Sequence, residues 1–527
     1  MTTRKLSLYD YQREAMASAL YHLENKHKRV ILELPTGGGK TETAAGIIMQ
    51  LLPNATGKFW FVVERLTLVE QAERRLKSYG LPVGVLQADR RDHDMPVVVA
   101  SAQTLKNLPA SWARDAALVF IDEAHIRHEK IIHAVKDYGA PTIGLTATPL
   151  RPGMGDDWQA IINVASTDQL TTSMNPKTGK SFLTPLRIFP AREDGAIKMA
   201  GEDPESKGEW SPRQVRKKTD KRIIGEIVKM WEKKTAEHFG GPVPTLVFTA
   251  DTQHGQQIVD EFNASGHNFA QGTYRDNRDA TAILSKKFQD GEYMGLASVN
   301  KYAIGYDHPA VRCIIGARPY MTSIIPLLQS VGRAVRPDDD KLYAIYLDCA
   351  ENTERWWPLI DAFWADGVHQ FRGHDDSVTR DEVAKTGDPN LCPHCNLLFS
   401  ARRTDCPQCG WVRPLKVATP PNVPGIIEEV HRARLEQNLP DPDFAASTLG
   451  ERDGYVWMHV CQIVRDEVGD VPTFEALGRA RWYYQAITGA PPTAAWPFSS
   501  SGFPDAQIIA AAAAVRRRYA DMKRRNA

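Results

Sequence analysis

The sequence contains no long apolar run and little cysteine. No stretch approaches the roughly 20 apolar residues that a membrane-spanning helix needs, and no apolar signal core follows the first six residues. We therefore expect an intracellular, cytoplasmic protein without a membrane partner. Seven cysteines in 527 residues are too few for a disulfide scaffold. Three of them, Cys313, Cys349 and Cys461, are scattered and are expected to be small buried apolar residues.

An excess of charge of one sign is also missing. The chain has 65 Lys and Arg against 64 Asp and Glu, a net charge of +1. The chain therefore lacks the overall positive charge that would by itself indicate nucleic-acid binding. Any anionic partner must be bound by local patches of basic residues. Hydrophobic residues at 42% and charged residues at 24% are typical of an ordinary globular protein.

Periodicity predicts an α/β protein with several domains, because 527 residues are too many for one core. Short β-branched runs alternate with longer amphipathic segments from 29 to 149 and again from 245 to 347, which is typical of parallel sheets covered by helices. We expect a first lobe at 1–151, a polar and basic connector or insertion at 152–222, a second lobe at 223–365, a linker at 366–390, a cysteine cluster at 391–413 and a mostly helical domain at 426–527.

A glycine loop follows the first predicted strand. The strand at 30–33 runs into the loop at 34–41, and a helical segment comes next. Consecutive N–H groups and a helix N-terminus can face a phosphate there, and glycine lets the backbone approach it. Lys40 would reach the β- and γ-phosphates of a nucleotide, and the Thr41 hydroxyl would bind Mg²⁺. Leu34 stands where the usual pattern has its first glycine, so a glycine turn with an incidental lysine is the alternative. The nucleotide-binding loop residues are Thr36, Gly37, Gly38, Gly39, Lys40 and Thr41.

Two carboxylates end a later apolar strand. Residues 118–121 are apolar and are followed by Asp122 and Glu123. At the carboxyl end of a strand, Asp122 can bind Mg²⁺ while Glu123 orients and deprotonates an attacking water. An acidic turn after a core strand is the alternative, but it does not explain the glycine loop upstream. The two elements together indicate an ATPase.

With these elements the sequence resembles the superfamily 2 helicases and translocases. The resemblance implies two tandem RecA-like lobes that close on ATP. It also assigns roles in the first lobe. Gln12, in Tyr11-Gln12, would read adenine through its side-chain amide, and Tyr9 stands where relatives often have Arg. His125 completes the catalytic Asp-Glu-Ala-His motif. Thr146 and Thr148 would couple hydrolysis to lobe movement, although a polar turn is the alternative.

The same resemblance assigns a second set of residues in the second lobe. Gly305 and Asp307 match a motif that contacts the nucleotide ribose and nucleic acid. The motif at 329–336 supplies Gln329, Arg333 and Arg336 to catalysis. We expect the two arginines on one helix face, with Arg336 as the arginine finger on the γ-phosphate.

Contacts to nucleic acid are expected to be polar and to involve its phosphate backbone, because a contact that reads bases would have to break at every step of a motor. Helix or strand caps are the alternative for each residue. By resemblance the contacts are Arg65, Thr67, Ser101, Gln103, Thr104 and Thr249.

Four cysteines form two Cys-x-x-Cys pairs separated by ten residues. Cys392, Cys395, Cys406 and Cys409 can place four thiolates around Zn²⁺, and His394 is expected to be exposed. A redox dithiol is disfavoured because neither pair follows a βα unit. These four cysteines predict a zinc ribbon at 391–413, called the ribbon below. It can be a docking module for nucleic acid or protein, or purely structural.

A superfamily 2 core followed by such a ribbon most resembles the RadD-like bacterial DNA-repair ATPases. We therefore expect a cytoplasmic motor that uses ATP, Mg²⁺ and Zn²⁺ on single- or double-stranded DNA in repair, recombination or replication. A single-strand-binding or repair protein is a further expected partner. The alternatives are an RNA helicase, the motor subunit of a restriction or phage-defence complex, and a non-catalytic zinc-dependent nucleic-acid-binding scaffold.

Overall fold

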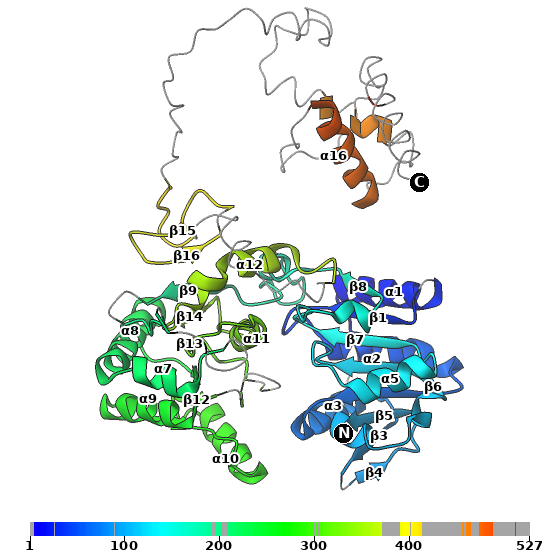
Figure 1. The fold of residues 1–527 in the computed structure, drawn as a ribbon, viewed down its shortest axis with the longest axis horizontal. Helices are drawn as coiled ribbons and strands as arrows, with labels where there is room; N and C mark the ends of the chain where they lie inside the picture. Colours follow the sequence, from blue (N-terminus) through cyan, green and yellow to red (C-terminus); the bar gives the residue numbers. More distant parts are fainter. Residues whose placement is uncertain are drawn as a thin grey trace, which may run out of the picture. The chain divides into compact units, whose positions relative to one another are not determined.

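The chain forms two compact units, residues 1–415 and 416–527. The computed structural model describes residues 5–25, 27–88, 90–191, 195–199, 201–202, 204, 209–299, 301–302, 306, 308–371, 390–400, 402–413, 456–457, 460–464, 474–488 and 512 (Figure 1). The described residues of the first unit form two eight-stranded sheets, each built mainly from one predicted lobe.

The first sheet has the strand order β4-β3-β5-β2-β6-β7-β1-β8 and is parallel except for β4. Its strands are β1 (Arg29–Glu33), β2 (Lys58–Val63), β3 (Val83–Gln87), β4 (Arg90–Asp92), β5 (Val97–Ser101), β6 (Ala116–Asp122), β7 (Thr142–Thr146) and β8 (Ala160–Asn163). Its helices are α1 (Asp10–Asn25), α2 (Lys40–Leu51), α3 (Leu66–Ser78), α4 (Ala102–Leu105) and α5 (Glu129–Asp137), with short 3₁₀ turns η1 (Leu52–Asn54), η2 (Ala110–Ala113) and η3 (Met154–Asp156).

Both faces of this sheet are buried. Along β1, Val30 and Leu32 pack with α1, α2 and α3, whereas Ile31 packs with α4 and α5 on the opposite face. Successive side chains of a strand point to opposite faces, so a strand covered on both sides is apolar throughout. This explains why the β-branched runs of the sequence are continuous rather than alternating.

The second sheet has the order β11-β12-β10-β13-β14-β9-β16-β15. Its strands are β9 (Leu186–Pro190), β10 (Thr245–Thr249), β11 (Phe269–Gln271), β12 (Gly295–Ser298), β13 (Cys313–Ala317), β14 (Ala344–Asp348), β15 (Asn390–Leu391) and β16 (Leu398–Phe399). The helices of this half are α6 (Thr167–Thr172), α7 (Pro212–Lys218), α8 (Lys221–Phe239), α9 (Thr252–Ala264), α10 (Arg278–Gln289), α11 (Ile325–Val331) and α12 (Asn352–Asp366). The structure therefore has the two parallel α/β lobes that the sequence predicted.

Helix α8 illustrates how local signals set an element. The Asp220 side chain accepts a hydrogen bond from the Ile223 N–H and caps the helix, which ends at Gly240 with φ 79°. Ile224, Ile227 and Trp231 repeat at helical spacing and are buried in the core of the second lobe.

Residues 152–222, expected as a connector or insertion, contribute to both sheets. β8 pairs in parallel with β1 at the edge of the first sheet, and β9 pairs in parallel with β14 in the second. The connector thus contains strands of both lobes.

The cysteine cluster continues the second sheet. β16 pairs antiparallel with β9 at Leu398 and Ile188, and β15 pairs antiparallel with β16. Cys392 and Phe399 are buried in the same apolar cluster as Phe189 of β9. The ribbon is therefore packed onto the second lobe.

The second unit is helical wherever it is described. Helix α16 (Phe474–Thr488) contributes Tyr483 and Tyr484 to a buried cluster with Trp457 and Cys461. Cys313 and Cys349 are likewise buried, which confirms the expectation for all three scattered cysteines. Among the described residues, no helix combines the length and apolar character that a membrane span requires.

Candidate active site between the two lobes

Three neighbouring strands deliver the predicted nucleotide residues to one edge of the first sheet. β7 lies between β6 and β1, with Asp122 in register with Leu145 and Thr146 in register with Glu33. The carboxyl ends of parallel strands meet at the same edge. The glycine loop after β1, the carboxylates at the end of β6 and the threonines after β7 are therefore adjacent.

The glycine loop has the backbone that only glycine adopts readily. Gly37 has φ 86° and Gly39 has φ 83°, and α2 begins at Lys40. The Lys40 ammonium donates to the main-chain oxygens of Leu34 at 3.2 Å and Pro35 at 3.5 Å. Burial lowers the pKa of Lys40, as do the nearby arginines Arg333 and Arg336, while Asp122 and Glu123 oppose the shift.

The Asp122 carboxylate lies close to the Glu123 carboxylate. Burial and the neighbouring Glu123 raise the pKa of Asp122, against the attraction of Lys40. Glu123 has φ 50°, a strained value for a residue with a side chain, and its N–H donates to Asp122 Oδ1 at 3.0 Å. Crowded carboxylates of this kind suit a divalent cation, because a cation would offset their repulsion.

The two arginines lie beyond the helix on which they were predicted. α11 ends at Val331, and Arg333 and Arg336 follow in turns. The expectation that Arg333 and Arg336 share one helix face is therefore wrong. The helix stops at Gly332, and Pro337 cannot extend it. Both side chains nevertheless line one cavity together with Lys40 of the first lobe.

The second lobe contacts the glycine loop directly. A methyl group at Gly332 would lie 2.9 Å from the Thr36 side chain, and one at Gly37 would lie 3.5 Å from Arg336 Cγ. A cavity of about 880 Å³ lies at this junction and is large enough for a nucleotide. Its lining from the first lobe includes Thr36, Lys40, Thr41, Asp122 and Glu123, and its lining from the second includes Arg333 and Arg336.

A hydrogen-bond chain joins the lobes beside the cavity. Gln329 Nε2 lies 3.0 Å from His125 Nε2, and His125 Nδ1 lies 3.1 Å from Thr146 Oγ1. An amide nitrogen only donates, so this amide orientation places the imidazole proton on Nδ1. Burial lowers the pKa of His125, although Glu123 opposes the shift, so the neutral form of the ring is favoured. Thr146 Oγ1 also accepts from the Thr148 N–H at 3.0 Å.

The predicted adenine-reading residues are engaged within the protein. Gln12 Nε2 donates to the Gly38 oxygen at 3.1 Å, and Gln12 Oε1 accepts from the Tyr9 N–H at 2.9 Å. The Tyr11 hydroxyl donates to the same Gly38 oxygen. Phe182 packs edge-on against both tyrosine rings. Adenine pairing by Gln12 stays a prediction that would require its amide to exchange these contacts. Two ribose-motif residues, Gly305 and Asp307, lie outside the described residues.

The predicted nucleic-acid contacts occupy different environments. The hydroxyl groups of Ser101 and Thr249 are buried, and Thr249 Oγ1 donates to the Asp251 oxygen. Arg65 is half-buried, and its guanidinium lies 3.4 Å from the Lys301 oxygen of the second lobe. Gln103 is exposed and Thr104 is half-buried, while the side chain of Thr67 lies outside the described residues. Their contacts to nucleic acid therefore stay predictions.

Glu33 is a buried acid that sequence reasoning did not single out. Its carboxylate accepts from the Val368 N–H at 2.9 Å and from the Asn163 amide at 3.3 Å. Asn163 also donates to the Asp366 oxygen, so the segment after α12 is held against the first lobe. Burial raises the pKa of Glu33 to about 8, although Val368, Lys40 and Asn163 oppose the shift. The sequence signal that could have identified Glu33 is its position as a charged residue at the end of an apolar strand.

Glu33 should make stability depend on pH. Between its ordinary pKa of 4.5 and about 8, the folded chain keeps a proton that the unfolded chain has lost, so unfolding free energy falls as pH rises. We expect Glu33→Gln to remove this pH dependence of the unfolding free energy. The unfolding free energy of the variant should rise relative to that of the wild type by about 2 kcal/mol between pH 6 and pH 8.5. Urea unfolding at both pH values measures the difference. The exposed Glu129→Gln is the control, and parallel slopes for wild type and Glu33→Gln would contradict the prediction.

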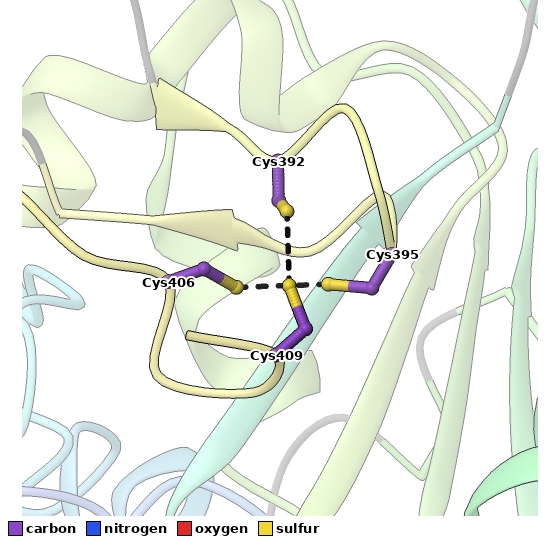
Figure 2. Close-up of side chains that lie close together, drawn as sticks. All are labelled: Cys392, Cys395, Cys406 and Cys409. Carbon is purple, nitrogen blue, oxygen red and sulfur yellow. Dashed lines mark hydrogen bonds between the residues drawn. The ribbon is translucent and has the colours of Figure 1, made fainter. Parts of the chain in front are cut away.

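The four cysteines converge from two loops onto one point, as Figure 2 shows. Their sulfur atoms all lie within 4.8 Å of one another, with Cys392 and Cys409 3.4 Å apart and Cys395 and Cys406 3.6 Å apart. A tetrahedral metal with sulfur at about 2.3 Å requires sulfur separations of about 3.8 Å. The donor set therefore fits a bound metal ion. His394 is exposed, as expected.

Comparisons with known proteins find similarity to helicases, translocases and restriction-enzyme subunits. Residues 5–151 match the family described as "Type III restriction enzyme, res subunit". A protein of Saccharomyces cerevisiae described as an ATP-dependent helicase, IRC3, is 26% identical over 65% of this chain and 51% of its own length. The DNA 3'-5' translocase XPB2 of Sulfurisphaera tokodaii is 24% identical over 65% of this chain and 81% of its own length.

Among solved structures, a fragment of an HsdR subunit of a type I restriction enzyme from Vibrio vulnificus YJ016 aligns with 69% of this chain and 67% of its own, at 18% identity and a TM-score of 0.46. The chain spans about half the length of the yeast relative.

Proposed function

Because this chain belongs to superfamily 2 of the helicases and translocases, we propose that it is an ATP- and Mg²⁺-dependent motor that acts on DNA. The observation that carries the proposal is the cavity lined by Lys40 and Asp122 of one lobe and Arg336 of the other. A phosphate-binding loop and an arginine from the second lobe in one cavity are what hydrolysis controlled by lobe closure requires.

In this proposal each side chain acts on the triphosphate end of ATP. Lys40 binds the β- and γ-phosphates, and Glu123 orients the attacking water and accepts its proton. Arg336, with Arg333 beside it, stabilises the negative charge that develops on the γ-phosphoryl group. Thr41 and Asp122 would hold Mg²⁺, which supplies further charge neutralisation when bound.

Hydrolysis is coupled to movement through the contacts between the lobes. Loss of phosphate removes the anion that holds Arg336 against the glycine loop, so the lobes separate. The His125 to Gln329 hydrogen bond crosses the same junction and continues to Thr146. Each opening and closing then shifts one lobe along the DNA backbone, which is contacted without reading bases.

The four cysteines are proposed to bind one structural Zn²⁺. Four thiolates in a tetrahedral arrangement are the usual ligands of a closed zinc site, and no open position is left for chemistry. The packing of the ribbon on β9 supports a structural role over a docking role. A four-cysteine ribbon directly after the second lobe also supports a RadD-like role in DNA repair.

DNA is favoured over RNA because one matched relative is named as a DNA translocase. A second candidate function, the motor subunit of a restriction complex, is favoured by the match of residues 5–151.

One assay tests the proposal. ATP hydrolysis is measured alone and with single-stranded DNA, duplex DNA and RNA, with Glu123→Gln as the inactive control. We expect stimulation by DNA and a loss of at least about a thousandfold in the control. Stimulation by RNA only would overturn the DNA assignment. Equal activity in Glu123→Gln would overturn the role of Glu123.

A further inference from the structure

The arginine proposed to act on the γ-phosphate lies in a segment without helix or strand. Arg336 follows the end of α11 and precedes Pro337, and its side chain is half-buried against Gly37. A displacement of about 1 Å in such a group can lower a rate about a hundredfold. The main chain at Arg336 therefore needs support from elsewhere.

Three hydrogen bonds fix the main chain at this point. The Thr184 N–H donates to the Val335 oxygen at 2.7 Å. The Thr184 hydroxyl and the Lys341 ammonium both donate to the Arg336 oxygen, each at 3.0 Å. The Arg336 oxygen thus accepts two side-chain hydrogen bonds, one from a residue that precedes it in the chain and one from a residue that follows it.

Lys341 is buried, with 4% of its surface exposed, which is unusual for lysine. Its ammonium also donates to the Pro309 oxygen at 2.9 Å. Burial lowers the pKa of Lys341 to about 7, against Asp338, and Arg312 and Arg336 add to the shift. Pro309 and Arg336 both line the cavity. One buried ammonium therefore ties together two loops of the second lobe at the nucleotide cavity.

Thr184 links the same point to the first lobe. It is buried at 2% exposure and belongs to the segment between β8 and β9. Its neighbour Leu183 lies 3.0 Å from the position of a methyl group at Gly37, and Phe182 packs against Tyr9 and Tyr11. The Thr184 hydroxyl can be removed without altering the Leu183 and Phe182 side chains that make this packing. A variant of Thr184 therefore tests the hydrogen bond separately from the packing.

We propose that Lys341 and Thr184 are positioning residues for Arg336, whose main-chain oxygen they hold so that the guanidinium enters the cavity. The proposal rests on the proposed ATPase function. Neither residue touches the nucleotide cavity in its own right, and neither carries a recognisable sequence signal. Lys341 follows three aspartates, a pattern that normally indicates a solvated surface.

Isosteric variants of both residues test the proposal in the full-length chain. Thr184→Val keeps the shape and removes the hydroxyl, while Thr184→Ser keeps the hydroxyl. Lys341→Met keeps the length and removes the ammonium. The matched control is Lys234→Met, which alters another buried lysine of the second lobe that is paired with Glu237 and not part of the cavity lining.

We expect Thr184→Val to lower kcat for DNA-stimulated ATP hydrolysis about fivefold to tenfold and Lys341→Met about fiftyfold, with KM for ATP within about twofold of wild type. Thr184→Ser should restore at least half of the wild-type kcat. In an Arg336→Ala background, Thr184→Val and Lys341→Met should each cost less than about twofold, because the group they position is absent. A purely structural role would not produce this non-additivity.

The outcomes separate the two proposals. Wild-type kcat in Thr184→Val, or full additivity with Arg336→Ala, would overturn the positioning role alone. Absence of ATP hydrolysis by the wild-type chain with every polymer would overturn the proposed function and this inference with it. If Lys341→Met fails to fold, as judged by thermal unfolding and metal content, Thr184→Val and its double variant decide the question.

Discussion

Replacing Arg336 with alanine should lower the rate constant of DNA-stimulated ATP hydrolysis about a thousandfold while leaving ATP affinity nearly unchanged. The reason is the place of its positive charge. Arg336 and Lys40 line the same cavity, and in the proposed mechanism the Arg336 guanidinium meets the charge that develops on the γ-phosphoryl group. An interaction made mainly in the transition state affects kcat rather than KM.

Steady-state kinetics and equilibrium binding of a fluorescent ATP analogue measure the two quantities separately. Arg336→Lys retains the charge without the planar donor fork and should recover only a small part of the rate. The exposed Arg114→Ala, which removes an arginine stacked on Tyr138 of the first lobe, is the control and should behave as wild type. A thousandfold loss of ATP affinity with unchanged kcat would contradict the finger role.

Loss of the proposed Zn²⁺ should destabilise the second lobe and not only the ribbon. Cys392 and Cys406 are buried within the core of that lobe, and β16 is hydrogen-bonded to β9. Without the metal, four thiols in a tight cluster no longer hold the two loops together, and β9 loses β16, one of its two neighbours. We expect Cys406→Ser to lower the unfolding free energy of the second lobe by about 3 kcal/mol or more.

Metal content by mass spectrometry and thermal unfolding with and without a chelator measure this effect. Cys461→Ser, which alters a buried cysteine of the other unit, should retain one zinc per chain. Loss of zinc from Cys406→Ser without any change in the unfolding of the second lobe would show that the ribbon folds independently of the sheet.

The structure brings the predicted site residues together where each motif is local in the chain. The glycine loop, the Asp122 and Glu123 pair and the cysteine pairs each lie within a few residues, and the strand-to-loop transitions that position them are visible in the apolar pattern. The parallel topology then brings the first two together, because β1 and β6 flank β7 and end at one edge.

Prediction was less complete where pairing joins distant segments. Nothing near 186–190 indicates that this run pairs with β14, because parallel partners far apart in sequence leave no local signature. The helix expected to carry Arg333 and Arg336 ends at Val331, and Gly332, which follows it, lies close to Thr36 of the other lobe. The motif spacing alone did not indicate where the helix ends.

Some assigned polar residues were also placed by motif position without knowledge of burial. Ser101 ends the buried strand β5, and the Thr249 hydroxyl is used to bond the Asp251 oxygen, so neither faces solvent. Lys341 is the opposite case, because a lysine after three aspartates is typical of a solvated surface, whereas this side chain is buried and bonds two main-chain carbonyl groups. The burial of a side chain depends on the assembled fold and not on its neighbouring residues in the sequence.

The origin of β8 and β9 in one connecting segment limits how the protein can be dissected. A first lobe produced alone keeps its whole sheet only if it extends through Asn163, and a second lobe only if it begins before Leu186. Truncation after residue 151 or before residue 223 would leave the backbone N–H and C=O groups of β1 or β14 without partners. Such uncovered strands invite pairing between chains, so fragments cut at those points should self-associate.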